Sequence, residues 1–298
     1  MAPIKPGQKI GVMAPSSYVE KNDIEKSAEV LRARGYDVFI HPQTYERHGQ
    51  SAGDTLQKSL ALQGLWLRPD IDAIWFAGGG NQSMPLLSSL NFTSMAKKPK
   101  PVIGFSDTTT LINAIHLHTG AVTYHAPVFK QLHTLSDDDL SLTLNGLGDM
   151  PPPITFTKDQ ILKAPDDTTS VTATLAGGNL SVFQYLPTLL GENLYKDKIL
   201  FLEDCNEELS HIDRIFCFLK QSGALSQVKA LLIGQFTNLK DTGRPFGRDL
   251  KEILLSHTEE CKTPIITHLP FGHASPFAPL SLGNPYTINL ENMTLKNA

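Results

Sequence analysis

Short apolar runs alternate with amphipathic stretches through the first half of the chain. The apolar runs predict strands, because nearly continuous apolar positions are typical of strands that are covered on both faces. These runs lie at residues 9–14, 37–41, 71–77, 102–105 and 121–124. The stretches between them have helical spacing of apolar residues. Strands that alternate with helices predict a mostly parallel, doubly wound α/β sheet of the Rossmann-like type.

Local signals indicate where the first helix begins and ends. The side chain of Asn22 can cap a helix, and Glu25 three residues later completes the pattern of a capping box. Gly35 is a typical stop signal, because glycine readily adopts the left-handed conformation after a helix. We therefore expect the helix to begin at Asn22 and to end before Gly35.

Residues 146–169 interrupt the alternation of strands and helices. This segment is rich in proline and lacks helical periodicity, with a single short strand expected at 154–157. We predict that it links an N-terminal Rossmann-like domain, residues 1–145, to a smaller C-terminal α/β (α+β) domain, residues 170–298. In the second domain, apolar runs at 171–175, 198–202, 228–234 and 264–267 predict strands, and the tail at 279–295 predicts edge strands or irregular structure.

The overall composition excludes several classes of protein. Hydrophobic residues make up 41% and charged residues 19% of the chain, as in ordinary globular proteins. The net charge of -4 provides no basic field for nucleic acid or for an acidic membrane. No apolar run reaches the ~20 residues that span a bilayer, and the first residues lack the apolar core of a signal peptide, which predicts a cytoplasmic protein. The 3 cysteines have no CxxC spacing, which favours reduced structural thiols.

Three consecutive glycines follow the predicted strand at 71–77. Glycines let a backbone approach a ligand closely and let N–H groups converge. The pattern around Gly78 to Gly80 is neither a P-loop nor GxGxxG. Gly78, Gly80 and Asn81 are candidate substrate-binding residues, and a plain tight turn is the alternative.

Ser106 lies in a sharp turn between the predicted strand at 102–105 and an amphipathic helix. A serine there is exposed at the carboxyl end of a strand, close to the positive end of a helix dipole, where a nucleophile would be placed. On local sequence alone, capping of the helix is the more frequent role. Ligands of doubly wound sheets bind outside the carboxyl ends of strands, so Ser106 and the glycine turn could meet in space.

Two more residues complete a possible catalytic set. Glu203 follows the predicted strand at 198–202, and His273 lies in a turn rich in proline and glycine. In a triad, histidine takes the proton of the serine, and the carboxylate fixes the tautomer of the histidine. The order Ser–Glu–His is one known solution, and the N–H of Asp107 with one from the glycine turn could form an oxyanion hole. From the residues alone this triad is one choice among many, and no HExxH or DxD pattern predicts a metal.

The chain resembles the LD-carboxypeptidase family of serine peptidases, which also includes the microcin C immunity peptidases. The resemblance runs nearly end to end and is carried by the segments KPGQKIGVMAPSS, AGGGNQS, IGFSDTTTL, LAGGNLS, ILFLEDCNE followed by HIDR, and LPFGH. It implies that Ser106, His273 and Glu203 form the catalytic triad, assembled across two domains. It also implies oxyanion donors at Gly79 and the amide of Asp107, no metal or organic cofactor, and a homodimer.

Some positions depart from the family pattern where substrate would be recognised. The glycine turn begins with Ala77 and ends with Asn81, whereas carboxypeptidases that act on murein tetrapeptides carry Arg-Gly-Gly-Tyr-Gly there. The asparagine is closer to the immunity-peptidase version. The common Trp before Gly-Gly-Asn is Ala176, and the frequent Pro-Tyr is Leu209-Ser210. The substrate is therefore the open part of the prediction.

The resemblance implies a cytoplasmic serine carboxypeptidase with a small peptide as substrate. The expected substrate is a murein L,D-tetrapeptide that loses its terminal D-Ala, as in peptidoglycan recycling. A peptidyl or aminoacyl nucleotide of the microcin C type is the alternative within the family, and a non-catalytic small-molecule-binding protein is the alternative from another class. Arg214 is a candidate for binding a terminal carboxylate through the family's IDR pattern. An ion pair of Arg214 with Asp213 or Glu207 is the alternative.

Overall fold

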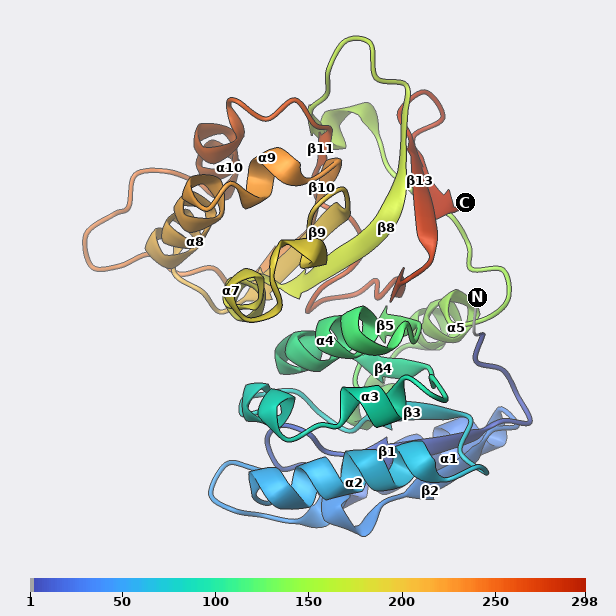
Figure 1. The fold of residues 1–298 in the computed structure, drawn as a ribbon. Helices are drawn as coiled ribbons and strands as arrows, with labels where there is room; N and C mark the ends of the chain where they lie inside the picture. Colours follow the sequence, from blue (N-terminus) through green and yellow to red (C-terminus); the bar gives the residue numbers. More distant parts are fainter. Residues whose placement is uncertain (1–2) are drawn as a thin grey trace. The chain divides into compact units, whose positions relative to one another are not determined.

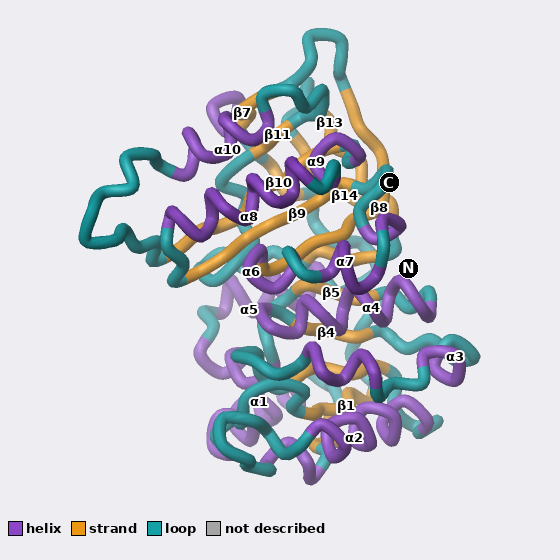
Figure 2. Tube along the Cα trace, turned by 60° about the vertical axis from the view of Figure 1, so that its left-hand side comes forward, coloured by secondary structure: helices purple, strands orange, loops and turns teal. Residues whose placement is uncertain are grey.

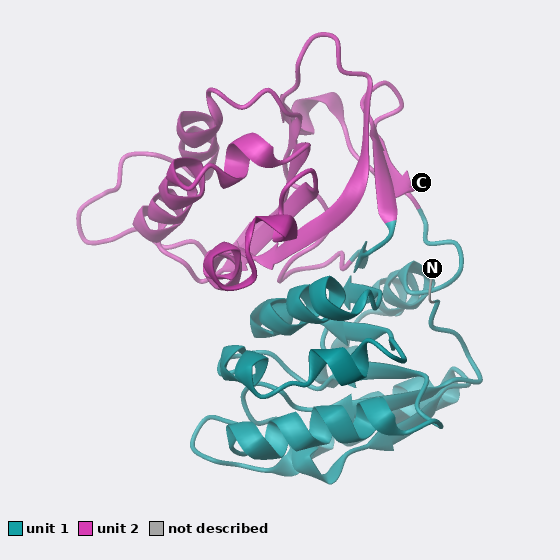
Figure 3. Ribbon diagram, viewed as in Figure 1, with its two compact units in different colours: residues 1–152, 278–284 teal, residues 153–277, 285–298 magenta. Residues whose placement is uncertain are grey.

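The computed structural model describes residues 3–298. The chain forms two compact units: residues 1–152 with 278–284, and residues 153–277 with 285–298 (Figure 3). The segment Ala278–Asn284 lies in the first unit, although the sequence analysis placed it in the C-terminal domain. Most of the expected linker, from Pro153 onward, belongs to the second unit.

The first unit is built on a mostly parallel sheet. Its strands are β1 (Lys9–Met13), β2 (Asp37–Ile40), β3 (Ala73–Phe76), β4 (Val102–Gly104), β5 (Thr123–His125) and β12 (Leu280–Leu282). They have the order β12-β5-β4-β3-β1-β2, and only the β12–β5 pairing is antiparallel among the described residues. Strands β3, β4 and β5 are wholly buried, which explains why they read as continuous apolar runs.

Helices cover both faces of this sheet. They are α1 (Lys21–Ala33), α2 (Thr55–Leu67), α3 (Phe92–Met95), α4 (Thr109–Thr119) and α5 (Asp137–Gly146), with 3-10 turns η1 (Pro42–Tyr45), η2 (Met84–Ser88), η3 (Ser106–Thr108) and η4 (Phe129–Thr134). Helices α2, α3 and α4 lie on one face, and α1 and α5 lie on the other (Figure 1). Ile24 and Leu31 of α1 are buried in the core with Leu140 of α5. The predicted doubly wound α/β class is thus confirmed.

The start of α1 differs from the prediction. The helix begins at Lys21 after Glu20, and no side chain caps it, so the expected cap at Asn22 is wrong. The capping box of the first unit's next helix was not predicted. There, Asp54 accepts a bond of 2.7 Å from the backbone of Gln57, whose side chain accepts one of 2.8 Å from the backbone of Asp54.

The second unit contains a mixed sheet. Its strands are β6 (Ile154–Thr155), β7 (Ile161–Lys163), β8 (Ser170–Asn179), β9 (Ile199–Cys205), β10 (Ala230–Thr237), β11 (Ile265–Ile266), β13 (Pro285–Asn289) and β14 (Thr294–Asn297). The order is β6-β14-β13-β8-β9-β10-β11-β7, with β8 to β11 parallel and the outer pairings antiparallel. Strand β6 was expected within the proline-rich segment, whereas β7 was not.

The helices of the second unit pack on one face of its central strands. They are α6 (Leu180–Phe183), α7 (Leu186–Leu190), α8 (Leu209–Gln221), α9 (Ala224–Gln227) and α10 (Leu250–Thr258), with η5 (Lys158–Gln160) and η6 (Glu192–Leu194). Figure 2 shows α8, α9 and α10 alongside β9 and β10. Their buried faces share a core in which Leu200 and Leu231 meet Phe216. Within residues 3–298, no helix has the length and apolar character needed to cross a bilayer.

Candidate active site

Ser106 occupies a strained position directly after β4. Its φ angle is 61°, in the left-handed region, which costs a non-glycine residue roughly 1–2 kcal/mol. Its hydroxyl forms no cap bond in η3 or α4 and no other hydrogen bond within the described residues. The local alternative, a helix cap, therefore does not describe this serine. A partly exposed, strained serine with a free hydroxyl is typical of a functional position.

The glycine turn lies against this hydroxyl. A Cβ atom on Gly79 would lie 2.9 Å from the Cβ and 3.2 Å from the Oγ of Ser106, so this close approach requires glycine. The carbonyl of Gly79 accepts a bond of 3.3 Å from the backbone of Ser17, and its N–H donates none within residues 3–298. The structure thus brings together Gly79 and Ser106, as the strand order required.

The carboxylate of Asp107 ties the surrounding loops to Ser106. Its Oδ2 accepts hydrogen bonds from the Ser16 hydroxyl at 2.6 Å and from the Ser83 backbone at 2.9 Å. The Ser83 hydroxyl donates to the carbonyl of Asp107 at 2.7 Å. The carboxylate therefore holds the loop after β1 and the end of the glycine turn beside η3. Sequence reasoning singled out only the amide of this residue.

A buried lysine supports the glycine turn from the other side. Lys58 of α2 is 1% exposed, and its ammonium donates to the Ser51 hydroxyl and to the Gln82 carbonyl, both at 2.9 Å. Burial lowers the pKa of Lys58, while the charge of Asp107 raises it. Sequence reasoning missed this residue, because a lysine in an amphipathic helix ordinarily reads as exposed.

The remaining residues of the turn face outward. Asn81 is exposed; its side chain donates to Gln50 at 3.0 Å, and its backbone donates to the Ser17 hydroxyl at 3.3 Å. These contacts connect the turn to the loops after β1 and before α2. Gly80, with φ of 112°, adopts a conformation that favours glycine.

In the second unit, Glu203 and His273 form a pair in which the carboxylate is fully buried and the imidazole is partly exposed. Glu203 is 0% exposed in β9, and its Oε2 lies 2.6 Å from Nδ1 of His273. A carboxylate partner at Nδ1 makes this nitrogen the donor and assigns proton transfer to Nε2. The turn that carries His273 is fixed by Gln235, whose Oε1 accepts a bond of 2.9 Å from the backbone of Ala274. This is the arrangement that a general base requires.

The surroundings of Glu203 and His273 raise the pKa of both groups, which favours their protonated forms. Burial raises the pKa of Glu203, and the hydrogen bond with His273 opposes this effect. Burial would lower the pKa of His273, but hydrogen bonds with Cys205 and Glu203 outweigh it and raise this pKa above its ordinary value. The two groups therefore titrate as a pair. Cys205, expected to be only structural, interacts with the imidazole.

Asp204 points away from this pair, as alternation along a strand requires. Its carboxylate accepts bonds from the Asn179 amide at 2.8 Å and from Ser181, at 2.8 Å from the backbone and 2.6 Å from the hydroxyl. Burial raises the pKa of Asp204, against the effect of these bonds. The contacts join the end of β9 to the start of α6, which holds Glu203 in place.

The structure corrects one sequence alternative. Arg214 is exposed on α8 and forms no ion pair with Asp213 or Glu207 among residues 3–298. Asp213 instead pairs with Arg248 at 2.9 Å and with His257 at 2.8 Å, and Glu207 pairs with His211. In the described part of the chain, no three His, Cys, Asp or Glu side chains are grouped as metal ligands.

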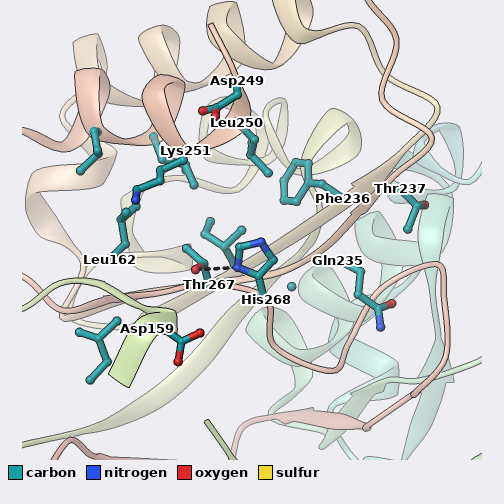
Figure 4. A pocket seen from close by; sticks show the side chains of 15 residues that line it. Asp159, Leu162, Gln235, Phe236, Thr237, Asp249, Leu250, Lys251, Thr267 and His268 are labelled. Carbon is teal, nitrogen blue, oxygen red and sulfur yellow. Dashed lines mark hydrogen bonds between the residues drawn. The ribbon is translucent and has the colours of Figure 1, made fainter. Parts of the chain in front are cut away.

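A separate cavity of about 880 Å³ lies in the second unit near the ends of β10 and β11. Figure 4 shows Asp159, Lys251 and His268 around it, with Phe236 and Leu250 on its apolar wall. His268 lies 3.0 Å from the Thr267 hydroxyl through Nδ1. Neither Glu203 nor His273 lines this cavity. The candidate chemistry therefore lies outside the cavity, whose size alone would suit a small molecule.

Two family models match the chain. The LD-carboxypeptidase N-terminal domain matches residues 10–126, and the LD-carboxypeptidase C-terminal domain matches residues 172–288. The chain belongs to the LD-carboxypeptidase family. It is thus a peptidase, and the first match contains Ser106 while the second contains Glu203 and His273.

Curated relatives of this chain match almost its whole length. The probable murein peptide carboxypeptidase of Bacillus subtilis is 28% identical over 97% of this chain and 91% of its own. The microcin C7 self-immunity protein MccF of Escherichia coli is 24% identical over 99% of this chain and 94% of its own. A muramoyltetrapeptide carboxypeptidase structure from Oxalobacter formigenes is 29% identical, covers 97% of both chains and has a TM-score of 0.82. The two-domain α/β architecture is that of the family.

Proposed function

We propose that this peptidase is a serine-type L,D-carboxypeptidase in which Ser106, His273 and Glu203 form the catalytic triad. The observation that carries the proposal is the bond of 2.6 Å between the fully buried Glu203 and His273. A fully buried carboxylate needs a partner, and a histidine held at Nδ1 leaves Nε2 for proton transfer. The strained, unpaired Ser106 supplies the nucleophile.

Each residue has a defined role in this mechanism. Nε2 of His273 takes the proton of the Ser106 hydroxyl as its oxygen attacks the carbonyl carbon of the terminal amide bond. The imidazolium, stabilised by Glu203, then donates this proton to the leaving amine, and the acyl group stays on Ser106. Water attacks the acyl-enzyme by the same route in reverse and releases the shortened peptide. The mechanism requires Ser106 to come within hydrogen-bond reach of His273.

Backbone N–H groups stabilise the negative charge on the attacked oxygen. Asp107 is next to Ser106 at the start of η3, where the first N–H groups lack partners within the helix. Gly79 lies against the Ser106 side chain, and its N–H is free within the described residues. These two donors are the proposed oxyanion hole. Removing one such donor typically lowers the rate by about 10²–10³-fold.

The proposed substrate is a murein tetrapeptide that loses its terminal D-Ala. Relatives named as murein peptide carboxypeptidases support this choice. The reaction needs no metal or organic cofactor, because the three side chains and two N–H groups provide nucleophile, base and charge stabilisation. Peptidoglycan recycling in the cytoplasm, by a homodimer, is the proposed setting.

A second candidate substrate is an aminoacyl or peptidyl nucleotide. Structures of MccF are described in complex with aspartyl sulfamoyl adenosine and with glutamyl sulfamoyl guanosine. The exposed Asn81 favours this alternative, because the immunity-peptidase version of the turn resembles this chain at that position. The triad would act in the same way on either substrate.

A serine-directed phosphonate tests the chemistry. It should label Ser106, and the label should disappear in Ser106→Ala and fall strongly in His273→Ala. Ser88→Ala is the matched control, because this exposed serine bonds to Pro85 and should leave labelling unchanged. Absence of label at Ser106 in the folded protein would exclude the serine mechanism and favour the non-catalytic binding alternative.

Mass spectrometry of two compounds tests the substrate. The murein tetrapeptide should lose its terminal D-Ala, whereas an aminoacyl sulfamoyl adenylate should stay intact. Cleavage of the adenylate alone would exchange the first candidate for the second. If Ser106 is labelled but neither compound is cleaved, both substrate assignments are wrong and the triad stands.

A further inference from the structure

The substrate of a carboxypeptidase ends in a carboxylate, which requires a cationic or strongly donating partner. Two cationic side chains near the glycine turn are already engaged. Lys58 is buried and donates to Ser51 and Gln82. Arg47 forms two bonds with Glu20, at 2.7 and 2.8 Å, and lies 4.2 Å above the ring of Tyr18. Neither is available for a substrate without losing these contacts.

Lys130 differs from both. It lies in η4, and its backbone N–H donates to the carbonyl of Ala77 at 3.0 Å, which anchors it beside the glycine turn. Its Cδ and Cε each lie 3.6 Å from the position of a Cβ on Gly78. Its ammonium has no hydrogen bond or ion pair within residues 3–298, and the side chain is partly exposed. Its stem packs on the turn while its charge stays available.

A small cavity lies beside this ammonium. It has a volume of about 320 Å³, and Ser17 and Gln50 line it together with Lys130. Two acidic residues also line it, but Glu20 is paired with Arg47, and Asp23 lies 3.7 Å from His133. Among the residues that line it, Lys130 is the only cation, and its ammonium has no hydrogen bond or ion pair within the described residues.

Lys130 and Ser106 lie against neighbouring residues of the glycine turn. Lys130 packs on Gly78, and Ser106 packs on Gly79. An extended residue of substrate spans roughly 3.3–3.6 Å. A peptide with its scissile carbonyl at Ser106 places its terminal carboxylate one residue further on. The flexible four-carbon stem of a lysine can adjust over such a distance.

We propose that Lys130 binds the C-terminal carboxylate of the substrate, and that the cavity lined by Lys130, Ser17 and Gln50 is the subsite for the terminal residue. This inference rests on the proposed carboxypeptidase function, which it deepens. A carboxylate on Lys130 forms an ion pair as well as a hydrogen bond, whereas a C-terminal amide offers the ammonium only a neutral carbonyl oxygen. Lys130 therefore selects peptides with a free end.

The test compares the murein tetrapeptide with the same peptide ending in D-alaninamide. Hydrogen bonds to charged groups contribute about 1.5–3 kcal/mol, so wild type should prefer the free acid in kcat/KM by roughly 10- to 150-fold. In Lys130→Met, kcat/KM for the acid should fall by a similar factor, while kcat/KM for the amide stays nearly constant. Lys130→Arg should retain most of the preference.

Lys26→Met is the matched control, because it removes an exposed lysine of α1 and the same charge from the same unit. It should keep the acid preference of wild type. An unchanged acid-to-amide ratio in a folded Lys130→Met variant overturns the role of Lys130 while the carboxypeptidase function stands. If wild type cleaves neither peptide, the murein-peptide substrate and this subsite are both wrong, and labelling of Ser106 decides separately whether the serine mechanism stands.

Discussion

The two regions that carry the candidate triad are held by different forces. Around Ser106, the backbone sets the geometry: a φ angle of 61° and close packing on Gly79 place the hydroxyl. Around His273, a side-chain bond of 2.6 Å to the fully buried Glu203 sets the orientation of the ring. The first region depends on shape, and the second depends on charge.

This difference predicts how each region fails. A methyl group added to the glycine turn should displace the oxyanion donors without changing the pKa of His273. Removing the charge of Glu203 should change the titration of His273 without moving the backbone of β9, because Asp204 separately fixes that strand end. Rate and pH profile therefore report on different regions.

The largest loss of activity is expected when either the nucleophile or the base is removed. Ser106→Ala and His273→Ala should each lower kcat by about 10⁵-fold or more, and the double variant should be no slower than either single variant. This non-additivity follows because the base is useless without its nucleophile. Single-turnover kinetics on the tetrapeptide provide the measurement. Additive losses would show that the two regions do not act as one triad.

The next effect concerns the charge of Glu203. Glu203→Gln should lower kcat/KM by about 10³–10⁴-fold at neutral pH, because the amide no longer fixes the tautomer or stabilises the imidazolium. In wild type the raised pKa of His273 places the rise of activity above the ordinary value of about 6.5. The variant loses the part of this effect that comes from Glu203, so its rise should move to lower pH.

A second variant controls for the loss of a carboxylate charge beside a histidine elsewhere in the same unit. Asp213→Asn removes the charge from a contact of 2.8 Å with His257 between α8 and α10. It should leave the pH profile of kcat/KM in place. The same shift in both variants would show that the profile reports general electrostatics rather than His273.

A smaller loss of kcat is expected when the packing of the glycine turn on Ser106 is disturbed. Gly79→Ala places a methyl group 2.9 Å from the Cβ of Ser106, so the turn must move and one oxyanion donor is misplaced. We expect kcat to fall by about 10²–10³-fold with the pH profile unchanged. Gly64→Ala in α2, where nothing lies within 4 Å of the new atom, should retain full activity. Equal activity of both alanine variants would contradict an oxyanion role for Gly79.

Much of the fold follows from the sequence, because strands buried on both faces read as apolar runs. The parallel sheet of the first unit is of this kind. The exceptions have physical causes. Strand β12 comes from the far end of the chain, and no local pattern indicates which sheet a short strand joins. The cap at Asn22 was wrong because the helix starts one residue earlier, at Lys21.

For the candidate site, the motifs indicated Ser106, Glu203 and His273, but not the residues that support them. The roles of Lys58 and Lys130 depend on which loops fold over their side chains. Burial of a charged side chain is a tertiary property, so helical spacing alone predicts exposure. The same limit hid the effect of Cys205 on the pKa of His273.

The smallest effect on rate is expected for Lys58, which binds the carbonyl of Gln82 behind the glycine turn and forms no hydrogen bond with Ser106 in the described part of the chain. Lys58→Met removes the donor to the Gln82 carbonyl and the Ser51 hydroxyl, and each buried group left without a partner costs about 1–3 kcal/mol. The glycine turn should loosen, and kcat should fall roughly 10- to 100-fold with less change in KM. Thermal unfolding and steady-state kinetics measure both effects.

Lys100→Met is the control that distinguishes a loss of stability from a loss of positioning of the glycine turn. Lys100 is also a buried lysine, and it donates to the carbonyls of Arg68 and Ile71, before the start of β3 rather than after its end. Lys100→Met should therefore lower the free energy of unfolding about as much as Lys58→Met, yet leave kcat of the folded enzyme unchanged. If both variants lose activity only in proportion to unfolded protein, Lys58 stabilises the unit but does not position the turn.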